Sequence, residues 1–234
     1  MQSVDRFTKD LIVLPKLTRL DGPTRFYEVP TGEHYPSVTS VIGAMSDKSA
    51  LEEWRVRVGQ EEAEKITAVA GSRGSTIHGL CEQYVLGEPI SRADVMPFNL
   101  IMFDQIKHVL DLHVNNIRCL EGMLYSHTLR VAGAVDLVAD WKGKPAIIDY
   151  KTSIKDKQRD WIQGYFLQAS MYAFMFWEMT GILCNDIVVL IAIEQSPFAQ
   201  VFEDKPRSGC RRLRPFVASI TKNTLDIIII IHYS

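Results

Sequence analysis

Cysteine is scarce in this sequence, and long apolar runs are missing. The four cysteines, Cys81, Cys119, Cys184 and Cys210, form no CxxC pair and have no histidine-rich spacing. We therefore expect reduced thiols, and we expect no zinc site, iron–sulfur cluster or disulfide framework. The isoleucine run Ile227–Ile231 is far shorter than the ~20 residues that a membrane helix requires.

Neither sign of charge dominates. Lys and Arg total 26 against 28 for Asp and Glu, which gives a net charge of -2. A nucleic-acid partner would therefore have to bind a local basic groove. The first residues show neither the apolar stretch of a secretory signal nor the Arg- and Ser-rich pattern of a transit peptide. We expect a cytoplasmic protein with no targeting signal and no membrane partner.

The 234 residues, 47% of them hydrophobic, are enough for one domain with a sizeable core. We expect that single domain to span residues 1–234. It would consist of an N-terminal hairpin (20–39), a helical portion arching over the core (40–115), a core (116–202) and an atypical tail (203–234). Helices flanking a mixed central sheet make the expected fold class α/β or α+β.

The helical portion is predicted from apolar periodicity and capping residues. Asp47 or Ser49 would cap a helix that continues to Ile66. Gly71–Ser75 is expected to be a glycine-rich turn that opens the next helix. A further amphipathic helix is expected over 96–114.

From Ile117 onward the apolar period changes from 3.6 to 2 or to continuous runs, which predicts strands. Strands are expected over 119–125, 130–140 and 145–150. They would be followed by a long helix over 160–179 and a buried strand over 186–194.

Two acids and a lysine stand out within these strands. Asp136 and Asp149 would lie side by side in a hairpin, and Asp149 and Lys151 would share one face. Two carboxylates on apolar strands are costly unless a cation neutralises them, and hard oxygen ligands suit Mg²⁺ or Mn²⁺. One or two such ions would support phosphodiester hydrolysis, with Lys151 orienting or deprotonating the attacking water and its pKa lowered by partial burial. The alternative is a pair of solvated strand-end acids with an edge-strand lysine.

Five motifs occur in a fixed order along the chain. They are GxxxH at Gly74–His78, Glu121, GxxD at Gly133–Asp136, DxK at Asp149–Lys151 and QxxxY at Gln168–Tyr172. In this order the chain resembles the RecB-like branch of the PD-(D/E)XK nuclease superfamily.

Two further segments, Pro36–Thr39 and Arg73–His78, are similar to the mitochondrial genome maintenance exonuclease family and its phage-encoded relatives. The resemblance covers roughly residues 20–202. It implies a restriction-endonuclease-like core.

The resemblance also implies roles for individual residues. The metal ligands would be the side chains of His78, Asp136 and Asp149 and the backbone carbonyl of Tyr150. Lys151 would be the catalytic lysine. Three more residues would lie beside the active site: Glu121, Gln168 and Tyr172. Outside this context His78 would be a satisfied helix histidine, Glu121 a surface residue and Tyr172 a core residue.

The predicted function is a metal-dependent DNA exonuclease that acts on single-stranded ends in replication, recombination or repair. Trp54 and Trp161 are candidates for base stacking, with plain core packing as the alternative, and Arg55 and Arg73 are candidates for DNA contact. We expect a monomer in a bacterial or phage-infected cell. Two other functions stay open: a duplex-end recombination exonuclease, and a catalytically inactive nucleic-acid-binding module of the same fold.

Overall fold

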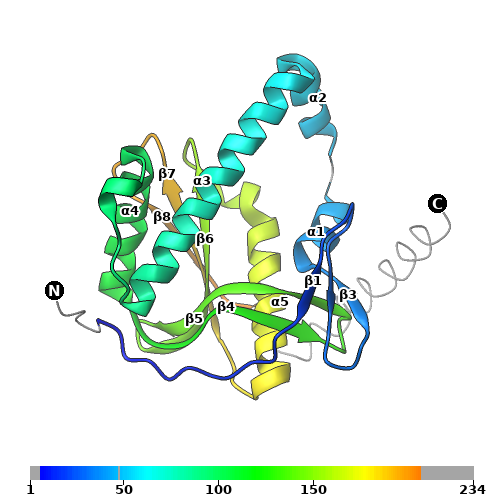
Figure 1. The fold of residues 1–234 in the computed structure, drawn as a ribbon, viewed down its shortest axis with the longest axis vertical. Helices are drawn as coiled ribbons and strands as arrows, with labels where there is room; N and C mark the ends of the chain where they lie inside the picture. The colour runs from blue at the N-terminus through cyan, green and yellow to red at the C-terminus, as the bar shows by residue number, and fades with distance from the viewer. Residues whose placement is uncertain (1–5, 47, 207–234) are drawn as a thin grey trace.

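The computed structural model describes residues 6–46 and 48–206, and its centre is a five-stranded sheet (Figure 1). Neighbouring strands are antiparallel, except that β6 and β7 are parallel. In sheet order the strands are β4 (Val114–Ser126), β5 (Val131–Trp141), β6 (Lys144–Ser153), β7 (Asp186–Ile193) and β8 (Gln200–Asp204). The mixed sheet predicted from the sequence is confirmed.

Helices cover both faces of this sheet, as the prediction required (Figure 1). Helix α5 (Gln163–Thr180) links β6 to β7 and packs on one face together with the short helix α1 (Val38–Met45). Helices α3 (Gln60–Leu86) and α4 (Pro97–His113) pack on the other face. The central strands are therefore buried on both sides, which explains their continuous apolar runs.

The N-terminal hairpin is part of a small three-stranded sheet. Its strands are β1 (Thr18–Leu20), β2 (Phe26–Glu28) and β3 (His34–Pro36). The extended character expected as far as Thr39 ends at Pro36. The reason is that Ser37 caps α1, its hydroxyl accepting a hydrogen bond from the Ser40 amide at 3.0 Å.

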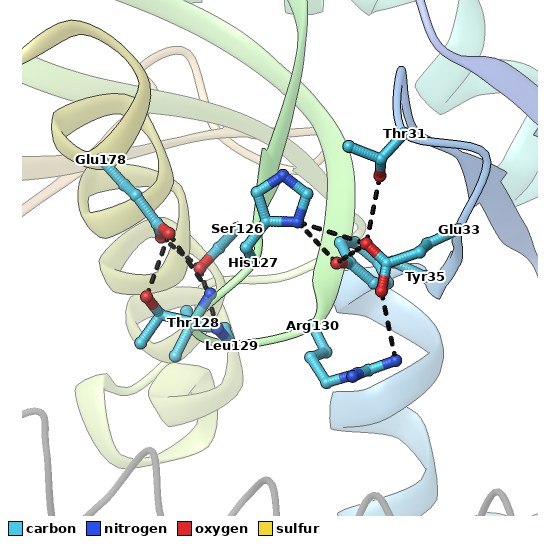
Figure 2. Close-up of polar contacts among 9 residues, drawn as sticks. All are labelled: Thr31, Glu33, Tyr35, Ser126, His127, Thr128, Leu129, Arg130 and Glu178. Atoms are coloured by element: carbon cyan, nitrogen blue, oxygen red, sulfur yellow. Dashed lines mark hydrogen bonds and ion pairs between the residues drawn. The ribbon is translucent and has the colours of Figure 1, made fainter.

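Polar contacts fasten this hairpin to the β4–β5 turn, and a second set fastens that turn to the end of α5 (Figure 2). The Tyr35 hydroxyl lies 2.9 Å from a Glu33 carboxylate oxygen and 2.6 Å from His127 Nδ1. On the other side of the turn, Glu178 of α5 accepts hydrogen bonds from the amide and hydroxyl of Thr128 at 3.2 and 3.0 Å. The small sheet is thus attached to the main one through the β4–β5 turn, which α5 holds from its other side.

The helical portion differs from the prediction in two ways. The first helix does not continue to Ile66, because α2 (Ser49–Val58) ends at Gly59, whose φ of 86° lies in the left-handed region. Gly71–Ser75 is not a turn, because it lies inside the 27-residue helix α3. Glycine weakens a helix by only about 1 kcal/mol, which the burial of Ile77 and later residues in α3 offsets.

Helix α2 and the first half of α3 project beyond the sheet as an arm (Figure 1). No residue of α2 is buried, so the apolar face expected for this segment is not covered. The proposed capping residue Asp47 and the tail from residue 207 lie outside the described residues. The short helices η1 (Arg92–Asp94) and η2 (Arg159–Ile162) complete the fold. Among the described helices, none has the length and apolar character needed to cross a membrane.

Candidate active site

The two predicted acids, Asp136 on β5 and Asp149 on β6, lie where these two strands stop pairing and separate. We call this place the β5–β6 fork. The strands are joined by the two-residue turn Lys142–Gly143, whose φ values of 50° and 81° are typical of a tight hairpin. Residues of β5 and β6 are paired from this turn as far as Leu137, which lies opposite Ile148, and the pairing ends there. Beyond it, the Tyr150 amide donates a 2.7 Å hydrogen bond to Asp136 Oδ2. A carboxylate therefore takes the place of a backbone partner where the strands separate.

His78 enters this fork from α3. Its Nδ1 lies 3.4 Å from Asp136 Oδ1, and its Nε2 lies 2.9 Å from the Tyr150 carbonyl oxygen. The ring packs edge-on against the Tyr150 ring at a centroid distance of 5.8 Å. The structure therefore brings together three predicted metal ligands: His78, Asp136 and the Tyr150 carbonyl.

Glu121 completes a possible metal-binding triad with His78 and Asp136. It lies on β4 with a φ of 46°, a left-handed conformation rare for glutamate, between the pairs Leu120–Leu137 and Gly122–Val135. One ligand atom from each of His78, Glu121 and Asp136 lies within 4.8 Å of the others. The residue type and spacing suit a hard divalent cation.

Asp149 and Lys151 share a face of β6, as strand alternation predicted. Lys151 Nζ forms an ion pair with Asp149 Oδ2 and lies 5.2 Å from the centroid of the Tyr165 ring. Asp149 Oδ1 is buried and has no hydrogen-bond partner among the described residues. A buried carboxylate oxygen without a partner is costly, so this donor set fits a cation that supplies the missing interaction.

The charges in the cluster shift one another's pKa values. Burial raises the pKa of Asp149 to about 6, although Lys151 opposes it, and burial with the nearby charge of Asp136 raises that of Glu121 to about 7. Burial alone would also raise the pKa of Asp136, but the hydrogen bond and charge of His78 outweigh it and lower that pKa. The cluster therefore holds carboxyl groups of unequal proton affinity.

The prediction of a lowered pKa for Lys151 is wrong. Burial does act in that direction, but the carboxylates of Asp149 and Asp136 outweigh it and raise the pKa. Lys151 is therefore an ammonium in this arrangement. It can orient a water molecule or stabilise negative charge, but it is not prepared to accept a proton.

Gln168 and Tyr172 lie one turn apart on α5, with the Gln168 amide 3.3 Å from the Tyr172 hydroxyl. Tyr172 is buried and packs on β5 at Gly133, where an added Cβ would lie only 3.0 Å from the ring. The glycine of GxxD and the tyrosine of QxxxY are therefore linked by contact. A role for this pair in substrate binding stays a prediction.

The four candidate DNA-binding residues are spread over the molecule. Trp54 and Arg55 lie on α2 in the arm, and Trp161 is 69% exposed on η2. Arg73 is only 7% exposed and forms a 2.7 Å ion pair with Glu194. Its charge is thus engaged within the protein, and its contact with DNA stays a prediction.

Sequence reasoning missed Tyr165 as a site residue, because its position in the apolar stripe of α5 made it resemble a core residue. The signal available was its place seven residues before Tyr172, on the same side of the helix. For the left-handed conformation of Glu121, the one sequence signal available was the glycine that follows it. In the structure, an added Cβ at Gly122 would lie 2.0 Å from the Cys119 sulfur.

The fold and the cluster together define a mixed α/β protein with a candidate divalent-metal centre. Comparison of the sequence with known proteins identifies similar proteins. The chain is 29% identical over 139 residues to the human mitochondrial genome maintenance exonuclease 1, a match that covers 56% of this chain and 40% of that protein. The Xenopus tropicalis protein of that name is 28% identical over 129 residues (52% and 37%), and the Mus musculus protein 27% over 130 residues (52% and 38%).

The predicted resemblance to the mitochondrial genome maintenance exonucleases is therefore confirmed. The chain matches about two fifths of the length of these relatives. No protein-family profile matches it.

Proposed function

We propose that this protein is a divalent-metal-dependent deoxyribonuclease with a PD-(D/E)XK core that removes nucleotides from single-stranded DNA ends. The observation that carries the proposal is the cluster at the β5–β6 fork, where two buried acids, a histidine and a lysine meet. Similarity to proteins named as exonucleases supports the same activity. The monomeric state, the cytoplasmic setting in a bacterial or phage-infected cell, and the role in replication, recombination or repair stay predictions.

Several groups of the cluster would hold the metal ion. His78, Glu121, Asp136, Asp149 and the Tyr150 carbonyl are the groups available to hold Mg²⁺ or Mn²⁺. Bound there, the ion would polarise the scissile phosphate and acidify the attacking water.

Lys151 would contribute electrostatic stabilisation. Its ammonium is kept charged by Asp149, and its side chain is only 19% exposed. A charge held in a partly dry site stabilises the developing phosphorane more strongly than it would in water. Proton acceptance from the water would fall to a carboxylate of the cluster.

Digestion of end-labelled single-stranded and duplex oligonucleotides with Mg²⁺, Mn²⁺ or EDTA tests the proposal. We expect cleavage of single strands from their ends with either metal, and none in EDTA. Preferential digestion of duplex ends would select the recombination exonuclease instead. Binding without cleavage under every metal condition would select the inactive module.

His78 provides a sharper test of the metal site. His78→Ala should raise the Mg²⁺ concentration needed for half-maximal activity more than it lowers the rate at saturating metal, with partial rescue by Mn²⁺. The wild-type protein should favour Mn²⁺ at low metal concentration, because imidazole binds Mn²⁺ better than Mg²⁺. His108→Ala on α4 is the matched control. An unchanged midpoint for His78→Ala would remove the histidine from the metal site.

A further inference from the structure

Glu121, the β4 member of the candidate metal site, adopts a backbone conformation that needs support. In the strand register it lies opposite Asp136 of β5, between two regular residue pairs. Its φ of 46° nevertheless lies in the left-handed region, which is unfavourable for a residue with a Cβ. In this conformation a carboxylate oxygen lies within 4.8 Å of ligand atoms of His78 and Asp136. A strained residue persists only where its surroundings hold it, and such residues cluster at functional sites.

The Cys119 thiol provides part of that support. Its sulfur lies against Gly122, so close that a Cβ added to residue 122 would overlap it. The sulfur therefore fills the place that a side chain would take, and only glycine leaves that place open. Cys119 is 4% exposed, so the sulfur is enclosed by the protein on its other sides as well. We call residues 119–122 the Glu121 segment.

The N-terminal chain closes over the same glycine. Leu14 Cδ1 lies 3.1 Å from the position of the added Cβ at Gly122. The chain before Leu14 runs along β4, which is an edge strand of the sheet, and the Ile12 amide donates to the Arg118 carbonyl at 2.8 Å (Figure 1). The Glu121 segment is thus held between its own thiol and a second stretch of chain.

We propose that Cys119 and Gly122 are positioning residues that direct the Glu121 carboxylate to the metal ion. This inference rests on the proposed metal site, and neither residue belongs to the triad of ligand atoms. The sulfur packed on a bare Cα keeps the left-handed conformation in place. Groups that orient a metal ligand usually contribute about 10- to 100-fold to metal affinity. The competing explanation is ordinary core packing, which would affect stability and leave metal binding alone.

Binding of Mn²⁺ to the DNA-free protein measures this role without any cleavage, through the electron paramagnetic resonance signal of unbound Mn²⁺. Gly122→Ala should raise the Kd by about 10- to 100-fold, because the added methyl group and the sulfur cannot share one place. Cys119→Ala should raise the Kd less, since it removes support without adding a clash. The double variant Cys119→Ala/Gly122→Ala should bind at least about threefold more tightly than Gly122→Ala, because the methyl group takes the place of the sulfur.

A double-mutant cycle with Glu121→Gln separates positioning from packing. If Gly122 acts through Glu121, Gly122→Ala should leave the Kd of the Glu121→Gln protein unchanged while still lowering its melting temperature in EDTA. Cys184→Ala removes another buried thiol and is the matched control for Cys119→Ala. It should lower the melting temperature and leave the Kd of the otherwise wild-type protein unchanged.

A wild-type Kd in Gly122→Ala would overturn the positioning role, as would an equal loss of affinity from this substitution with and without Glu121. If Gly122→Ala does not fold, an unchanged Kd in Cys119→Ala overturns it. Parallel digestion of oligonucleotides with Mn²⁺ distinguishes this failure from failure of the proposed function. Wild-type protein that binds Mn²⁺ and cleaves, with variants that bind equally well, would overturn the positioning role alone. Wild-type protein that neither binds Mn²⁺ nor cleaves would overturn both.

Discussion

At the scale of single residues, Lys151 occupies the position where a substitution is most informative. Its ammonium contacts Asp149 directly and has no described role in packing the sheet. We expect Lys151→Met to lower kcat by about 10²- to 10⁴-fold, the usual contribution of a charged group that acts only in the transition state. Binding of DNA in Ca²⁺ should change little, because one lysine adds little to a contact with many phosphates.

The matched control for that measurement is Lys144→Met, which replaces the exposed lysine at the other end of β6. It should leave kcat unchanged. A Lys151→Met enzyme with near-normal turnover would remove the lysine from the reaction.

Glu121 makes the metal-free protein sensitive to pH. Its folded-state pKa is about 7 against an ordinary value of 4.5, because burial and the charge of Asp136 favour the protonated form. The folded state therefore binds a proton more tightly than the unfolded state, and the free energy of unfolding falls as pH rises from about 4.5 through about 7. Glu121→Gln should remove this loss, on the order of 1 kcal/mol after allowance for partial exposure.

Thermal melting in EDTA at pH 4 and pH 8 measures this effect. The variant should melt higher than the parent at pH 8 and equally at pH 4. Glu88→Gln, at an exposed position after α3, serves as the control. Parallel pH profiles for parent and Glu121→Gln would show that Glu121 is not the group responsible.

At the scale of secondary-structure elements, Gly133 sets how closely α5 approaches β5. An added Cβ would lie 3.0 Å from both the Cε1 and the hydroxyl oxygen of Tyr172. We expect Gly133→Ala to displace the Tyr172 ring and to cost about 1–3 kcal/mol of stability, as overpacking of a core usually does. Gly74→Ala on α3, where an added Cβ meets nothing within 4 Å, should be neutral or stabilising in the same urea titration. Equal effects of the two substitutions would contradict the steric explanation.

The Arg73–Glu194 ion pair attaches α3 to the end of β7, and its two partners are unequally buried. Arg73 is 7% exposed and Glu194 42%. Glu194→Gln would leave a buried guanidinium without its counter-charge, whereas Arg73→Met would leave a carboxylate that water can reach. We expect Glu194→Gln to be the more destabilising change, by about 1–3 kcal/mol.

The same pair tests whether Arg73 binds DNA. If the Arg73 guanidinium binds a phosphate, Arg73→Met should reduce the slope of log affinity against log salt by about 1. A purely structural arginine would leave that slope unchanged while raising the Mg²⁺ midpoint, because α3 also carries His78. Measuring both quantities on one variant separates the two roles.

At the scale of the whole molecule, metal binding should stabilise the fold, since the proposed ligands come from α3, β4, β5 and β6. Mg²⁺ at about 100 times its Kd would add about 2.7 kcal/mol, which raises Tm by roughly 5–10 °C for a chain of this size. The increase should be smaller at pH 5.5 than at pH 8, because protons compete for Asp149 and Glu121. Differential scanning calorimetry of the parent and of Asp136→Asn, which should lose the shift, measures this directly. An equal shift in both proteins would place the ion elsewhere.

Short-range patterns predicted much of this architecture. Alternation in 145–151 correctly placed Asp149 and Lys151 on one face, and the expected hairpin correctly joined the two acid-bearing strands. Contacts between distant segments were not predictable. Nothing near Arg73 in the sequence indicates a partner 121 residues away, and the three-residue strand β1 is too short to give a pattern.

The same limitation explains the misassigned glycine-rich segment of α3. Local propensity favours a turn at Gly71–Ser75, but packing of the later turns of the helix overrides it. The lowered pKa expected for Lys151 failed because that expectation weighed burial alone. The charge of Asp149, two residues away on the same face of β6, opposes the effect of burial, and with the charge of Asp136 it raises the pKa.

The long helix α3 has a consequence for local unfolding. Five of its six buried residues lie between Arg73 and Val85, and only Ala63 is buried before them. Opening the first three turns therefore exposes little apolar surface and costs little free energy. Opening the last three turns exposes buried core residues and costs much more free energy. Amide hydrogens of the arm will exchange with solvent long before those around His78. The projecting arm can fray and reform repeatedly while the cluster at the β5–β6 fork stays assembled.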